Sequence, residues 1–208
     1  MGIRERHGRA GTRAGRVRLK TCPPRPIAWG MLRWLPVVLI CAGLLLAGAP
    51  QEASARGCRG AHARPTAHNN ALMRSALLCL HNRARAAHGI RRLHGNRRLT
   101  RAARGHSRRM VRAHFFSHIG PSGARVSQRT RRVGYARRRS FAVAENLGWG
   151  TGSHATPRRI FRAWIASSLH RANVLNGRYR SIGIGVAPGA PRAGLGPGGT
   201  YTVVYGTR

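Results

Sequence analysis

The feature of this sequence that most restricts how it can fold is its shortage of acidic side chains. The whole chain has 39 lysine and arginine residues but only 3 aspartate and glutamate residues. Residues 56–208 hold 30 arginines and one carboxylate, Glu145, a formal net charge of +29 with histidine neutral. A buried carboxylate is costly unless it is paired. Glu145 is therefore expected either to share hydrogen bonds or a cation with histidines, or to fix its strand to neighbouring backbone or to an arginine.

Arginine supplies every cation in residues 56–208, since the single lysine of the chain is Lys20. A GC-rich genome accounts for missing lysine but not for missing aspartate. Guanidinium groups bind phosphate and carboxylate through two parallel hydrogen bonds. A positive field of this size attracts nucleic acid, anionic lipid or anionic wall polymers.

The first 55 residues have the pattern of a secretory signal peptide. An apolar run at residues 35–47 follows Arg33 and precedes the small-x-small sequence at 53–55. The run is shorter than the roughly 20 residues that a membrane-spanning helix needs, which argues against an anchor. We predict cleavage after Ala55, with translation beginning at Met1 or at Met31, and export of the remaining chain to the extracellular space or the cell envelope without a transmembrane segment.

Two of the four cysteines, Cys58 and Cys79, remain after this cleavage. An exported chain with two cysteines is expected to form one disulfide. Closing a loop of this length contributes about 3 kcal/mol in the chain-entropy description. Residues 56–70 are a polar lead-in, and residues 71–208 are long enough for one domain with a core.

Two helices are predicted in the first half of this domain. One covers residues 71–88 and stops at Gly89, and the second begins after Asn96, a favourable N-cap. Like charges four residues apart on its outer face destabilise the second helix by a few tenths of a kcal/mol each. That face is either solvated or binds anions; its arginines are Arg97, Arg101, Arg104, Arg108 and Arg112.

The second half is expected to form a small antiparallel sheet with one further helix. Residues 119–141 are expected to be a loop because of their proline and glycines. Thr156 and Pro157 are typical of a helix start. Alternating apolar residues predict strands, at 142–148, 181–187 and 200–205, the last two joined by a hairpin loop. The pattern predicts an α+β domain.

Three side chains form a candidate site for a divalent metal such as zinc. His118, Glu145 and His170 supply two imidazoles and one carboxylate and leave positions open for water or a ligand. They are spread over more than fifty residues, and residues 56–208 contain ten histidines. The sequence pattern alone favours a structural or surface role over metal binding for either histidine.

Four ordered segments resemble the CAP superfamily, the group of cysteine-rich secretory, antigen 5 and pathogenesis-related proteins. They are LHNRARAAHGIRRLHGNRRLTRAARGHSRRMVRAHFFSH, AENLGWG, WIASSLHRANVLNGRYRSIGIGVA and YTVVYG, which span nearly all of residues 72–206. The order and spacing are most similar to the bacterial SCP-like extracellular branch.

The resemblance implies an α-β-α sandwich with a central antiparallel sheet and a cleft. In eukaryotic members this cleft holds two histidines and two glutamates that can bind a divalent ion. The matching positions here are His118, Glu145, His170 and, in place of the second glutamate, Ser167. A serine is usual in the bacterial branch and is a poor metal ligand, which weakens the metal proposal. Asn173 is expected to fix the loop beside His170.

Two function classes follow. The first is a secreted, non-enzymatic module that binds a lipid or an anionic envelope ligand. The alternative is a metal-assisted hydrolase in which His118, Glu145 and His170 hold an ion that activates water. The missing second carboxylate and the absence of an HExxH helix argue against the hydrolase. Ser167 as a nucleophile with His170 as its base has no aspartate to orient it. Nucleic-acid binding is disfavoured by export and by the few aromatic side chains.

Overall fold

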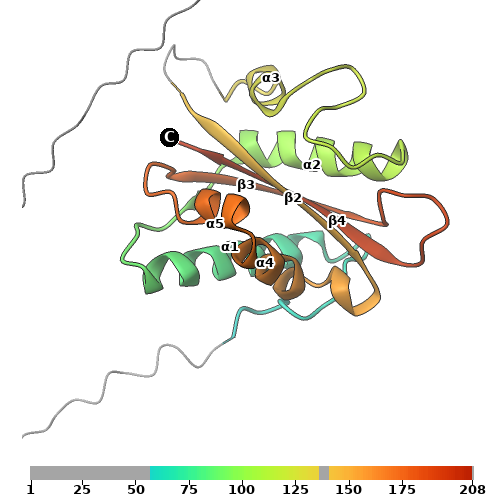
Figure 1. The fold of residues 1–208 in the computed structure, drawn as a ribbon, viewed down its shortest axis with the longest axis horizontal. Helices are drawn as coiled ribbons and strands as arrows, with labels where there is room; N and C mark the ends of the chain where they lie inside the picture. The colour runs from blue at the N-terminus through green and yellow to red at the C-terminus, as the bar shows by residue number, and fades with distance from the viewer. Residues whose placement is uncertain (1–56, 136–140, 208) are drawn as a thin grey trace, which may run out of the picture. The chain divides into compact units, whose positions relative to one another are not determined.

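The computed structural model describes residues 57–135 and 141–207 (Figure 1). The predicted signal peptide, Met31 and the cleavage position after Ala55 lie outside these residues. A four-stranded sheet in the order β1-β3-β4-β2 forms the middle layer. Its strands are β1 (His94–Gly95), β2 (Val143–Thr151), β3 (Ser181–Pro188) and β4 (Gly198–Gly206).

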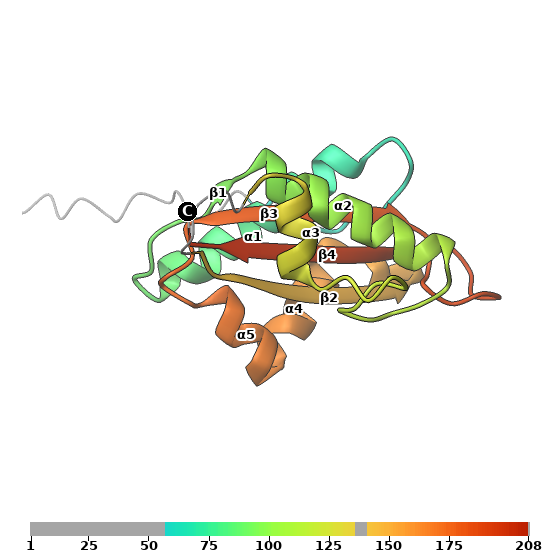
Figure 2. The same cartoon turned by 90° about the horizontal axis from the view of Figure 1, so that it is seen from above.

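Helices cover both faces of this sheet. On one face lie α1 (Asn70–Ala87), α4 (Pro157–Ala166) and α5 (Ser168–Val174); on the other lie α2 (Arg97–Arg112) and α3 (Val126–Arg132) (Figures 1 and 2). A short 3-10 helix, η1 (Gly152–Ala155), joins β2 to α4. The predicted α+β class and α-β-α sandwich are confirmed.

The sequence signals for most elements are confirmed to within a few residues. The side chain of Asn96 caps α2 by accepting hydrogen bonds from the backbone N–H groups of Arg98 and Leu99, at 3.0 and 3.1 Å. Thr156 caps α4 in the same way through the N–H of Arg159. β4 pairs antiparallel with both β2 and β3, as expected for the hairpin and its neighbour.

Three elements differ from the sequence prediction. The segment 119–141, expected to be a loop, contains α3, whose seven residues are too few to show a helical period. The helix predicted from Pro157 ends at Ala166, and a second short helix, α5, begins at Ser168. β1 has two residues and runs parallel to β3, so the sheet is not wholly antiparallel.

α2 lies directly against β3 because two strand positions have no side chain. A Cβ atom at Gly183 would overlap the backbone of Leu99 and Thr100, and one at Gly185 would overlap that of Ala103 and Arg104. Glycine in a strand often marks such close approach. The two core clusters, one under α1 and α4 and one under α2, are therefore separated by a sheet that the helices contact closely.

The predicted disulfide between Cys58 and Cys79 is confirmed, with their Cα atoms 5.7 Å apart. It joins the segment before α1 to the third turn of that helix. In the described part of the chain, no helix is both long enough and apolar enough to cross a membrane.

A fully buried arginine shows how the fold holds a cation without a carboxylate. Arg85 of α1 donates hydrogen bonds of 2.8 to 3.1 Å to four backbone carbonyls. These belong to Arg91, Val174, Asn176 and Tyr179. Burial and the nearby Arg180 lower the pKa of this guanidinium. Arg85 thereby fixes the segments after α1 and α5 to one helix.

A buried histidine makes the stability of the fold dependent on pH. The ring of His81 bonds the carbonyl of Leu77 through Nδ1 at 2.7 Å and the hydroxyl of Tyr205 through Nε2 at 2.9 Å. Burial lowers the pKa of His81 from 6.5 to about 4. The unfolded chain therefore takes up this proton at a higher pH than the folded chain does.

We expect the free energy of unfolding to fall as pH drops from 6.5 to 4, by about 3 kcal/mol from His81 alone. Urea unfolding across this range measures it. His81→Leu should reduce the slope, with some remaining because burial also lowers the pKa of His106. The control is His88→Gln, which removes an exposed histidine at the C-cap of α1 and leaves the buried ring of His81 in place. A full slope in His81→Leu would contradict the assignment.

Candidate functional site

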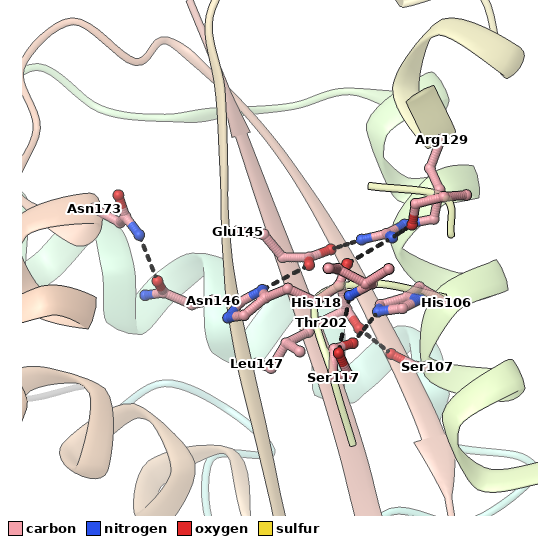
Figure 3. A network of polar contacts seen from close by, with 12 residues as sticks. His106, Ser107, Ser117, His118, Arg129, Glu145, Asn146, Leu147, Asn173 and Thr202 are labelled. Carbon is pink, nitrogen blue, oxygen red and sulfur yellow. Dashed lines mark hydrogen bonds and ion pairs between the residues drawn. The ribbon is translucent and has the colours of Figure 1, made fainter. Parts of the chain in front are cut away.

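The candidate site lies along β2, an edge strand of the sheet. Successive strand residues point to opposite faces, and Glu145 and Asn146 do so here (Figure 3). Glu145 points toward α2 and α3, whereas Asn146 points toward α5. Both side chains are buried. The neighbouring residues of one strand therefore anchor two separate groups of polar contacts.

The carboxylate of Glu145 has a cationic or hydrogen-bonding partner on each oxygen (Figure 3). Oε1 lies 2.9 Å from Nδ1 of His118, and Oε2 accepts from Nη2 of Arg129 at 2.6 Å. Arg129 is buried, whereas 56% of the His118 side chain is exposed. The arginine is thus the inner partner and the histidine the outer one.

Arg129 also holds the loop that carries His118. Its Nη1 donates to the carbonyl oxygen of His118 at 2.9 Å and to that of Ala124 at 2.6 Å. Nearby, the ring of His106 bonds the carbonyl of Ser117 through Nε2 at 2.9 Å. One guanidinium thereby links α3, the 118–124 loop and β2 to each other.

Sequence reasoning missed Arg129 because it lies in the segment that was expected to be a loop. Among 30 arginines in residues 56–208, nothing in its local sequence distinguishes it. The signal that was available is the lone carboxylate: Glu145 was expected to have a partner, and an arginine was one of the stated alternatives.

On the opposite side of β2, amide groups position α5. Asn146 donates from Nδ2 to the carbonyl of His170 at 3.0 Å and to the hydroxyl of Tyr205 at 3.1 Å. Its Oδ1 accepts from Asn173 at 2.8 Å. Asn173 was expected to fix this loop, and the contact explains how. The hydroxyl of Tyr205 continues the network to His81.

Ser167 and His170 contact each other at the start of α5. Nδ1 of His170 lies 3.0 Å from Oγ of Ser167. Burial, and then the charge of His118, lower the pKa of His170. The distance suits a nucleophile and its base. Within residues 57–135 and 141–207, however, the one acidic side chain is already paired elsewhere, so no carboxylate orients His170.

The four predicted cleft residues therefore form two contacting pairs: His118 with Glu145, and Ser167 with His170. In the part of the chain that the structure describes, no three His, Cys, Asp or Glu side chains lie close enough to hold a metal together.

The carboxylate of this donor set does not fit as a ligand of a divalent ion. One carboxylate oxygen of Glu145 is 2.6 Å from a guanidinium, which occupies the cationic position that an ion would need. The other oxygen is engaged by His118, and the fourth position is a serine, a weak ligand. The arrangement instead suits an internal ion pair that joins loop, helix and strand.

Comparison with known proteins gives the family. The profile of the cysteine-rich secretory protein family, CAP, matches residues 78–205, which are 128 of the 208 residues. The chain belongs to the CAP family. Its match to the uncharacterized protein YkwD of Bacillus subtilis is 28% identical over 106 residues, or 51% of this chain and 39% of that protein.

Solved structures share the CAP fold. A Bacillus anthracis extracellular protein containing an SCP domain has a TM-score of 0.54 and 22% identity, covering 68% of this chain and 44% of that one. An outer surface protein of Borrelia burgdorferi has a TM-score of 0.52 and 19% identity, covering 64% and 90%. This CAP chain thus spans less than half the length of the Bacillus proteins to which it is similar.

If Glu145 and Arg129 act as a pair, their substitutions will not be additive. Glu145→Gln and Arg129→Met should each lower the free energy of unfolding by about 3–5 kcal/mol, because each leaves a buried polar partner unmatched. The double variant should lose less than the sum by at least about 1 kcal/mol. Urea titration of the four proteins measures this coupling.

The control is Arg132→Met, which removes an exposed arginine from the same helix and should change stability by less than about 0.5 kcal/mol. Additive losses for Glu145 and Arg129 would show that the two side chains stabilise the fold independently.

Proposed function

We propose that this CAP protein is an exported, non-enzymatic binding module that attaches to a phosphodiester-bearing component of the cell envelope through its arginines. The apolar run at 35–47 and the small-x-small sequence at 53–55 support export. The Cys58–Cys79 disulfide supports an oxidising compartment. The descriptions of the Bacillus anthracis and Borrelia burgdorferi structures, extracellular and outer surface, agree with this location.

The observation that carries the proposal is that the carboxylate of Glu145 is already fully paired within the protein. Both oxygens of the sole acidic side chain in the described residues are taken by His118 and Arg129. The exposed arginines of α2 therefore have no carboxylate partner in that part of the chain. An anionic partner for these arginines would have to come from outside the described residues, and guanidinium groups suit phosphodiesters, which stay ionised at all physiological pH values.

The pairing of both Glu145 oxygens with His118 and Arg129 also favours a binding function over hydrolysis. In the metal-assisted hydrolase considered for this site, Glu145 would ligate the ion or act as a general base. Glu145 is paired with a buried guanidinium, so it fills neither role without breaking that pair. We therefore assign a structural role, that of holding loops in place, to the four cleft residues His118, Glu145, Ser167 and His170.

Two envelope components carry the required phosphodiester: a glycerol-phosphate wall polymer and an anionic phospholipid. A lipid has a reason of its own, because three apolar side chains are exposed beside the cleft histidines. Phe116 is 41%, Ile119 42% and Leu169 81% exposed. Both sources therefore belong in the binding experiment as separate arms.

We expect the exported protein to bind a synthetic linear glycerol-phosphate polymer with strong salt dependence. With four arginine contacts, the affinity should fall by about a thousandfold for a tenfold rise in salt. Calorimetric titration measures the polymer, and co-sedimentation measures vesicles of phosphatidylglycerol against phosphatidylcholine.

Binding of the vesicles but not of the free polymer would assign the lipid as the source. Binding of either probe that is unchanged between low and high salt would contradict the proposal. Hydrolysis of a phosphodiester or ester probe that is lost in Glu145→Gln, in a variant that remains folded, would contradict the non-enzymatic assignment.

A further inference from the structure

The outward face of α2 forms an elongated cationic hollow of about 550 Å³. Four of the residues that line it are arginines, spaced three or four residues apart so that they share one helix face: Arg97, Arg101, Arg104 and Arg108. At 1.5 Å per residue, the first and last of them are about 16 Å apart along the helix. A single small anion cannot contact all four, so the geometry favours a ligand with repeated charges.

Like charges come close to each other at the edge of this hollow. Arg74 of α1 reaches the same edge of the sheet, where it lines a small cavity with Gly95 and Thr100, two residues that also line the hollow. Burial, and then the charge of Arg104, lower the pKa of Arg74. In the described part of the chain none of these arginines has a carboxylate partner. An anion bound there would relieve this repulsion.

Gly105 is a glycine that the packing of the protein does not require. It lies in the interior of α2 and is exposed, and a Cβ atom there would have no heavy atom within 4 Å. Glycine is less favourable than alanine in a helix interior. The glycines of β3 differ, because Gly183 and Gly185 are needed for helix packing.

Gly105 lies where two hollows meet. It lines the 550 Å³ hollow and also a second one, of about 150 Å³, between α2 and α3, which is lined further by Arg109 and Arg132. Arg101 is likewise shared by both. A missing side chain at this point leaves the helix backbone bare in the middle of the cationic surface, which is a common reason for glycine where a ligand approaches closely.

We propose that a linear phosphodiester polymer lies along α2 from Arg97 to Arg108 and makes its closest approach to the protein at Gly105. This site rests on the proposed function and specifies where and how the envelope component binds. The repeated phosphates pair with successive guanidinium groups, and the chain between two phosphates passes over the bare backbone.

The lining of the hollows favours a polyol-phosphate chain over a nucleic acid. No Phe, Tyr or Trp side chain lines either hollow in the described structure, so bases would have no platform on which to stack. Repeated charge at helical spacing is the feature that selects the ligand.

The test compares variants of the exported protein for binding to the synthetic glycerol-phosphate polymer, with calorimetry at one low salt concentration. Gly105→Ala and Gly105→Gln should weaken binding several-fold, Gln more than Ala, while their unfolding midpoints stay at or above that of the unsubstituted protein. If Gly105 had only a structural role, its substitution would not weaken binding while leaving the unfolding midpoint unchanged or higher.

A charge-matched pair of variants locates the site. Arg101→Gln/Arg104→Gln should lower the affinity about tenfold or more, since each lost contact is a charge-assisted hydrogen bond. Arg59→Gln/Arg178→Gln removes the same two charges from exposed positions that line neither hollow, and should lower it less than about threefold.

Equal losses in the two charge-matched variants, or unchanged binding in both Gly105 variants, would overturn this site while leaving salt-dependent binding intact. No binding by the unsubstituted protein would instead overturn the proposed function. Tighter binding of single-stranded DNA than of the glycerol-phosphate polymer at equal charge would overturn the ligand class.

Discussion

The ion pair between Glu145 and Arg129 is the interaction on which the rest of this side of the fold depends. It is buried, its carboxylate and guanidinium are 2.6 Å apart, and the same guanidinium holds the carbonyls of His118 and Ala124. Without a carboxylate on β2, Arg129 would be a buried cation with carbonyl partners alone. Glu145 thus positions α3 and the loop before it through Arg129, and it also contacts the ring of His118 directly.

Elsewhere in the fold, neutral groups take the place of carboxylates as hydrogen-bond partners. Arg85 is fully buried among four carbonyls, and the neutral side chain of Asn146 connects β2 to α5. Four other arginines, Arg97, Arg101, Arg104 and Arg108, line the hollow on the outer face of α2. Residues 57–135 and 141–207 hold one acidic side chain, and this shortage explains both the neutral partners of Arg85 and the cationic surface of α2.

Much of the fold was predictable because it follows local signals: the Asn96 cap, the Thr156-Pro157 helix start and the alternating strands all form as expected. α3 was missed because seven residues show too little periodicity. The contact of His118 with Glu145 was anticipated, and Ser167 with His170 forms a second contacting pair. Where α5 packs against β2, and hence the contact of Asn146 with the carbonyl of His170, depends on long-range information that a single sequence does not contain.

The central claim is that Arg129 occupies the cationic position beside Glu145. The most direct measurement is the metal content of the purified protein, by mass spectrometry after equilibration with zinc and desalting. His118→Ala and His170→Ala proteins are measured in parallel, because ten histidines in residues 56–208 invite unspecific binding. The account predicts no stoichiometric ion, with any residual zinc indifferent to both substitutions. About one ion per chain, lost in both variants, would show that a divalent ion binds at the histidines beside Glu145 and would contradict this account.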